Sequence, residues 1–284
     1  MNIGNAWSAW KGLDRQQKEF LREKQEEATL RLDEWIPHLA KIVKFDREAD
    51  SIRKFLGWTG GLCLPAGIAI AIFAESAIPL VICIFGLGLL VSLWRLSKID
   101  VPNGLNSFLL PFLVLLREET KPDAAVTLKL DLRGFDADDK LLSKNGPSSL
   151  VTSLYKDSWF SGSTLLADGA SLEWDITDLV RQRRRRKTNA RGKTKTKTKT
   201  KARRTFDIHL NVRGKDYAIK ANPPELDDEI RQKIKQGEKR SEIRIRTQSV
   251  STDPTVAPDV DELVEAIASA YRNLTAPAEE RPTA

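Results

Sequence analysis

Few residues of this sequence have the types and spacing that chemistry requires, and the clearest group is acidic. The segment FDADDK at residues 135–140 contains Asp136, Asp138 and Asp139, and carboxylate oxygens are the ligands that calcium and magnesium prefer. The segment lacks the glycine and the downstream glutamate of a helix-flanked calcium loop. A charged turn after a strand is therefore the favoured interpretation, and we predict neither a metal site nor a cofactor.

Catalytic constellations are also missing from the sequence. It has no phosphate-cradling glycine motif, no His-Glu-x-x-His and no Gly-x-Ser-x-Gly. The only histidines are His38 and His209, and His209 falls on the polar side of an alternating segment, which predicts an exposed side chain. We therefore expect a protein that is not an enzyme and has no catalytic residue. A membrane-bound hydrolase or transferase that uses dispersed carboxylates, such as Asp136, Asp138 and Asp175, is the alternative.

The most unusual segment is the basic tract, residues 181–204. It holds 14 of the 46 Lys and Arg residues and none of the 39 Asp and Glu, so the rest of the chain carries 32 bases against 39 acids. The formal net charge of +7 therefore comes from one segment, and no diffuse nucleic-acid-binding surface is indicated elsewhere. The residues predicted to contact anionic lipid or phosphate are Arg183, Arg184, Arg185, Arg186, Lys187, Lys193, Lys195, Lys197, Lys199 and Lys201.

We expect the basic tract to be a flexible loop between two strands of a β domain. Its only apolar residues are Ala190 and Ala202, and like charges at every second position oppose stable strand pairing. The favoured partner is the anionic cytoplasmic leaflet, which attracts clustered Lys and Arg. Nucleic acid bound without sequence preference, an acidic protein surface, and a low-complexity insertion with no dedicated partner are the alternatives.

Two apolar segments, residues 56–74 and 77–94, predict a transmembrane helical hairpin. At about 1.5 Å of rise per residue, the first segment spans roughly 28 Å, close to the thickness of the hydrocarbon core. Neither segment has the polar stripe of a helix buried in a soluble core, and only Glu75 and Ser76 separate them. Because no charged residue lies at mid-depth, we expect an anchor rather than a channel.

The charges that flank this hairpin predict its orientation. Arg53 and Lys54 precede the first span, Arg95 and Lys98 follow the second, and the turn holds only Glu75. The positive-inside rule then places both chain termini in the cytoplasm. The sequence therefore predicts a multi-pass protein of the cell (inner) membrane, with the lipid bilayer as its first partner.

Residues 1–55 predict a helical cytoplasmic arm, because the segment at 14–35 is rich in helix formers. Glu26 and Glu27 interrupt any sustained heptad. An amphipathic helix packed on the protein itself, or lying at the membrane surface, is therefore favoured over a coiled coil. A protein partner bound through residues 5–55 and a homo-oligomer are the alternatives.

Residues 124–275 predict an antiparallel β-rich domain, either a sandwich or an open barrel. Several segments alternate with period two, such as VTLKLDLR at 126–133, and Asp168-Gly169 predicts a hairpin turn. A terminal helix is expected from about residue 259 to residue 274, where the apolar residues share one helical face.

Two further segments complete the expected organisation. Residues 95–123 contain a short apolar run that predicts an interfacial or buried linker helix, and residues 276–284 predict a disordered tail. The expected fold is thus an α+β membrane protein. The expected function is an integral membrane anchor or scaffold that presents a non-enzymatic cytoplasmic β domain, whose basic loop binds anionic lipid. A hydrolase or transferase, or a protein that tethers nucleic acid without sequence preference, is the alternative.

Overall fold

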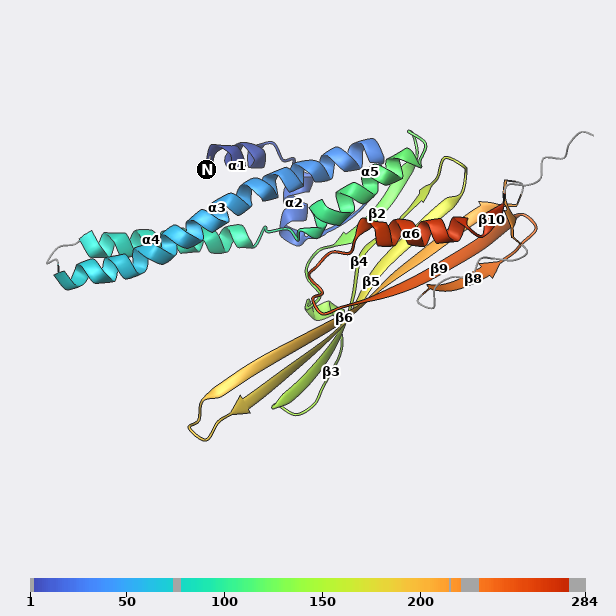
Figure 1. Ribbon diagram of the computed structural model, residues 1–284. Helices are drawn as coiled ribbons and strands as arrows, with labels where there is room; N and C mark the ends of the chain where they lie inside the picture. The colour runs from blue at the N-terminus through green and yellow to red at the C-terminus, as the bar shows by residue number, and fades with distance from the viewer. Residues whose placement is uncertain (1–2, 74–77, 215, 221–229, 276–284) are drawn as a thin grey trace, which may run out of the picture. The chain divides into compact units, whose positions relative to one another are not determined.

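The computed structural model describes residues 3–73, 78–214, 216–220 and 230–275, and its fold is α+β (Figure 1). The chain divides into two compact units. A helical unit comprises residues 1–24 and 37–105, and a sheet unit comprises residues 25–36 and 106–284. The Glu75-Ser76 turn and the tail at 276–284 lie outside the described residues.

Helices account for the described part of the helical unit. They are α1 (Ile3–Lys11), α2 (Arg15–Glu23), α4 (Ile78–Ser97) and α3 (Leu32–Phe73), whose first residues belong to the sheet unit. A capping box begins α2: the Asp14 carboxylate accepts from the Gln17 amide at 2.8 Å, and the Gln17 side chain accepts from the Asp14 amide at 3.0 Å. Lys24, in the left-handed conformation with φ of 57°, ends α2.

The helical arm predicted for residues 1–55 is wrong in one segment, because β1 (Gln25–Arg31) is a strand of the sheet unit. It pairs antiparallel with β2 (Ala125–Asp131), and Glu27 and Lys129 form an ion pair across the two strands at 3.0 Å. The sequence from Glu27 onward, Glu-Ala-Thr-Leu, alternates with period two, as a half-exposed strand requires. The residues on both sides of this short alternation favour a helix, and the sequence therefore predicted a helix throughout.

The apolar helices are the C-terminal part of α3 and the whole of α4, and both are long and apolar enough to cross a membrane. Only 11% and 6% of their most apolar stretches are buried, so most of their apolar side chains are exposed. The helices approach each other at small residues. Gly67 lies against Cys83, and Gly86 lies against Cys63, so a larger side chain at either glycine has no room.

One antiparallel sheet forms the centre of the sheet unit, with the order β1-β2-β4-β5-β6-β9-β8. The predicted antiparallel β-rich domain is confirmed. Of the two forms left open, the sandwich is wrong for the described residues, because helices rather than a second packed sheet cover the apolar face. The path of strands is open, with β1 and β8 at its ends. The other strands are β3 (Leu141–Asn145), β4 (Leu150–Leu165), β5 (Ser171–Thr188), β6 (Thr194–Arg213), β8 (Ile230–Lys235), β9 (Arg240–Ser251) and a separate pair, β7 (Ala218–Ile219) with β10 (Leu274–Thr275).

A cluster of aromatic rings joins α5 (Leu110–Glu118) to this sheet. The Phe112 ring lies 5.8 Å from Phe160 on β4 and 5.4 Å from Trp174 on β5, in edge-on contacts between ring centroids. Phe108, in the π-helical segment Leu105–Leu109, adds an edge-on contact to Trp159 at 5.6 Å. The sequence left an interfacial and a buried helix open for this apolar segment. In the structure one face of α5, with Phe112, Leu113 and Leu116, is buried in the sheet unit, whereas Val114 and Leu115 are exposed.

The terminal helix and the predicted hairpin turn are both confirmed. The helix α6 (Val260–Tyr271) begins at its cap Asp259 and packs on β6 and β9. The Asp168-Gly169 turn joins β4 to β5, with Gly169 at a φ of +84°. The Asp168 carboxylate accepts from the amide of Ala170 at 2.8 Å, which stabilises the turn.

Candidate functional site: a cationic β-ribbon

The basic tract is not a flexible loop, and that prediction is wrong. Strands β5 and β6 stay paired from Ser171↔Asn211 to Thr188↔Thr194, so the tract extends the sheet as a two-stranded ribbon (Figure 1). We use "ribbon" for residues 181–201. The amide of Lys193 donates to the Asn189 side chain at 2.8 Å in the closing turn, and Gly192 has a φ of +76°.

The ribbon forms in spite of its like charges because its neighbours favour strand pairing. The two strands are already paired along their apolar halves, so each added residue extends an existing ladder. Threonine alternates with lysine from Lys193 to Lys201, and β-branched threonine favours strands. The residues Leu150–Leu154 of β4 pair with Arg181–Arg185 and add a third strand to the base of the ribbon.

Alternation sorts the ribbon residues onto two faces, since successive side chains of a strand point in opposite directions. The cationic face carries eight cations and continues the polar face of the sheet; they are Arg181, Arg183, Arg185, Lys187, Lys195, Lys197, Lys199 and Lys201. The opposite face continues the apolar face of the sheet and is mostly neutral; it carries Gln182, Arg184, Arg186, Thr188, Thr194, Thr196, Thr198 and Thr200.

The structure thus brings together seven of the ten residues predicted to contact lipid or phosphate. It places Arg184 and Arg186 on the opposite face and Lys193 in the turn, and it adds Arg181, which was not predicted. Counting every second residue onward from the buried Trp174 separates the two faces, so this signal was present in the sequence.

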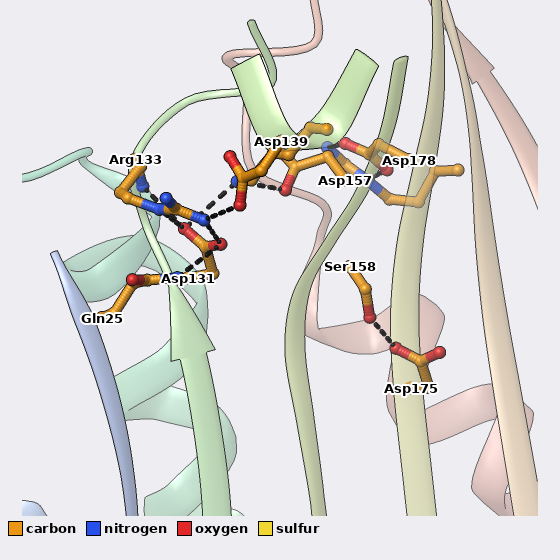
Figure 2. Close-up of polar contacts among 10 residues, drawn as sticks. Gln25, Asp131, Arg133, Asp139, Asp157, Ser158, Asp175 and Asp178 are labelled. Atoms are coloured by element: carbon orange, nitrogen blue, oxygen red, sulfur yellow. Dashed lines mark hydrogen bonds and ion pairs between the residues drawn. The ribbon is translucent and has the colours of Figure 1, made fainter. Parts of the chain in front are cut away.

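Buried ion pairs lie at the base of the ribbon, on the face opposite the cations. Asp157 on β4 lies beside Asp178 on β5, which lies beside Arg204 on β6. Arg204 donates to both Asp178 oxygens, at 2.8 and 2.7 Å. The ammonium group of Lys140 donates to Asp157 at 2.7 Å. Two buried carboxylates are therefore balanced by two buried cations, as Figure 2 shows in part.

Of the three acidic residues that the sequence offered as a cation ligand set, Asp139 is held by a cation of the protein itself (Figure 2). Asp139 accepts from Arg133 at 2.6 Å, and Arg133 also donates to Asp131 at 2.8 Å. Burial raises the pKa of Asp131, but hydrogen bonds from Arg133 and the charge of Lys140 outweigh it and lower that pKa to about 2. These interactions join Asp131, Arg133, Asp139 and Lys140 in a structural network.

The network predicts how stability depends on pH. A carboxyl whose pKa is lowered from 3.8 to about 2 in the folded state stabilises that state above about pH 4, and the contribution is lost as the pH falls towards 2. We expect the advantage of the wild type over Asp131→Asn in unfolding free energy to shrink by about 2 kcal/mol over this range. Urea titrations at stepped pH measure it, and an advantage that does not change with pH contradicts the assignment.

A second carboxylate group lies in the helical unit, around Arg53. Oxygens of Asp46, Asp50 and Asp100 approach one another within 4.8 Å. The Arg53 guanidinium, only 9% exposed, donates to all three, at 3.1, 2.5 and 2.5 Å. The cation of this cluster is thus the Arg53 side chain, and the four residues fix the segment that follows α4 to α3.

The polar face of the sheet holds an open groove of about 400 Å³. Asp175 and His209 line it, whereas Asp136 and Asp138 do not. His209 is half-buried rather than exposed, with Nε2 3.3 Å from Asp207. Asp207 in turn binds Arg244 and Arg246, which keep its pKa low against the effect of burial. The charged groups of the groove are thus largely paired with one another.

Comparison of the chain with protein-family models, with curated proteins and with solved structures found no match.

Proposed function

We propose that this protein is an integral membrane anchor that holds the sheet unit at the cytoplasmic surface as a binding module. The pair of apolar helices carries this proposal. The α4 helix has 20 residues, which correspond to about 30 Å, the thickness of the hydrocarbon core. Large apolar side chains point away from the protein along both helices, among them Leu62, Ile68, Ile72, Ile78, Leu80, Val81, Ile84, Phe85 and Leu87.

The charges at the helix ends support a cytoplasmic position of both termini. Lys54 lies before the apolar part of α3, and Arg95 and Lys98 lie at and after the last turn of α4. The ammonium group of Lys98 lies 3.7 Å from the ring centroid of Trp94. A tryptophan that is largely exposed beside a lysine is typical of a helix end at the membrane interface.

The ribbon supports a binding role for the sheet unit. Its cationic face offers guanidinium and ammonium donors with no acidic partner in the same cross-strand rows, and this chemistry suits phosphate groups. The alternative of a hydrolase or transferase is less well supported, because Asp136 and Asp138 do not share the groove with Asp175.

Extraction and cysteine labelling test the proposal. We expect the protein to remain in the membrane pellet after alkaline carbonate. With Cys63 and Cys83 replaced by serine, a membrane-impermeant maleimide should label Thr198→Cys only after the membrane is opened. The reagent should label Glu75→Cys in intact cells. Carbonate-soluble protein contradicts the anchor, and labelling of Thr198→Cys in intact cells contradicts the orientation.

A further inference from the structure

We propose that the cationic face of the ribbon docks flat on an anionic phospholipid surface, with the phosphate and carboxylate headgroups between its side chains. The inference deepens the proposed function, because it names what the binding module binds, and it rests on that function only for the nearness of lipid to a tethered domain.

The charged surface is larger than the ribbon itself. At its base, Lys156, Leu179, Arg203 and Val250 form one cross-strand row on the same face, over four strands. This row raises the number of cations on the face from eight to ten. The next row towards the core is Ser158, Thr177, Thr205 and Gln248, which is uncharged. Acids begin only beyond it, so the docking face carries one sign of charge.

Aliphatic side chains among these cations distinguish a lipid surface from a nucleic acid. Val250 is 74% exposed and Leu179 is 37% exposed. Leu179 lies between Lys156 and Arg203 in the row, and Val250 lies next to Arg203. Leu150 and Leu154 of β4, both half-buried, lie beside Arg185 and Arg181. Apolar groups gain free energy at the boundary of headgroups and acyl chains, whereas the backbone of a nucleic acid offers them nothing comparable.

The ribbon carries no aromatic side chain that could stack on bases. Its paired strands also hold the cations on one face before binding, which reduces the conformational entropy lost on docking. An array with its cations on one side suits an extended anionic surface, and the neutral threonines of the opposite face then point away from the lipid.

The two faces provide a matched pair of variants. Arg183→Gln with Arg185→Gln removes two charges from the cationic face, and Arg184→Gln with Arg186→Gln removes two from the opposite face of the same strand. A Lys or Arg near an anionic leaflet strengthens binding about fivefold. The first pair should therefore weaken binding about 25-fold, and the second, which lies on the far side of the ribbon, less than about threefold.

The test uses the full chain with its apolar helices inserted in nanodiscs of phosphatidylcholine. Lipid binding by the ribbon is then measured on separate vesicles. The nanodiscs are mixed with vesicles of phosphatidylcholine, with or without phosphatidylserine, and the bound fraction is measured by flotation at low and physiological salt. We expect binding to the anionic vesicles alone. Equal binding to neutral vesicles, or an equal loss from both pairs of variants, overturns the proposal.

A second arm separates lipid from nucleic acid. Leu179→Ser with Val250→Ser should weaken vesicle binding about tenfold and leave any binding of a short DNA duplex unchanged. Tight binding of the duplex without vesicle binding overturns the lipid assignment in favour of nucleic acid. Carbonate extraction tests the membrane anchor separately. A negative result for the anchor can therefore be distinguished from a negative result for lipid binding by the ribbon.

Discussion

Replacing Arg204 with methionine is expected to lower the free energy of unfolding of the sheet unit by about 3–5 kcal/mol. The guanidinium makes two hydrogen bonds to Asp178 and a third to the Val256 carbonyl, at 3.1 Å. Asp178 is 2% exposed and lies next to Asp157 in the strand register. Methionine therefore leaves a buried carboxylate without its cation and beside a second carboxylate, which is the costly case of a broken buried ion pair.

Two further variants make this prediction specific. Arg203→Met removes the same charge from the neighbouring residue, whose side chain is exposed, and should change stability by less than about 0.5 kcal/mol. Adding Asp178→Leu to Arg204→Met should recover much of the loss, because both charges are then absent. Urea titration of the full chain in nanodiscs, followed by tryptophan fluorescence, gives the three values. A similar loss for Arg203→Met and Arg204→Met contradicts this role of the buried pair.

Gly162→Val is expected to destabilise the sheet unit by about 3 kcal/mol, the upper end for overpacking. A side chain at residue 162 meets the Trp174 ring, the Thr127 carbonyl oxygen at 2.7 Å and the Leu128 side chain at 2.9 Å. The carbonyl belongs to the backbone of β2 and cannot rotate away. The Trp174 ring is also fixed, because it packs against Phe112 and Phe160.

The neighbouring residue on the same strand serves as the control. Ser161 lies on the polar face of β4, opposite Asp175, and lines the open groove, and valine has a suitable strand propensity. We expect Ser161→Val to change the free energy of unfolding by less than about 0.5 kcal/mol in the same titrations. Equal destabilisation by both variants indicates that β4 tolerates no branched side chain, and it contradicts the specific role assigned to Gly162.

Several elements could be predicted from the sequence because their signals are local. The apolar runs of α3 and α4, the Asp168-Gly169 turn and the apolar stripe of α6 each depend on residues close together in the chain. The strand β1 was missed, since its partner β2 is about 100 residues away and only that pairing makes Gln25–Arg31 a strand. Local propensity for helix is strong in this segment, and the tertiary contact overrides it.

The ribbon was missed for a different physical reason. Repulsion between like charges opposes strand pairing, but exposed charges are screened by salt, and the Lys-Thr alternation favours a strand. The buried pair of Asp178 and Arg204 was also invisible, because both residues fall where buried apolar side chains continue the pattern of β5 and β6. The burial and the pairing of Asp178 and Arg204 depend on the register of three strands, and this register cannot be predicted from a single sequence.

The ordered ribbon places the cations on one face, and amide hydrogen exchange of the full chain in nanodiscs tests whether it is ordered. In an antiparallel ladder, alternate amides of β6 point towards β5 and are bonded. We therefore expect slow exchange at about half of the amides from Thr194 to Lys201, and at most of those from Arg181 to Arg185, which lie between two strands. Exchange throughout residues 181–201 at the rate of an unstructured chain contradicts the ribbon, and with it the separation of the cations onto one face.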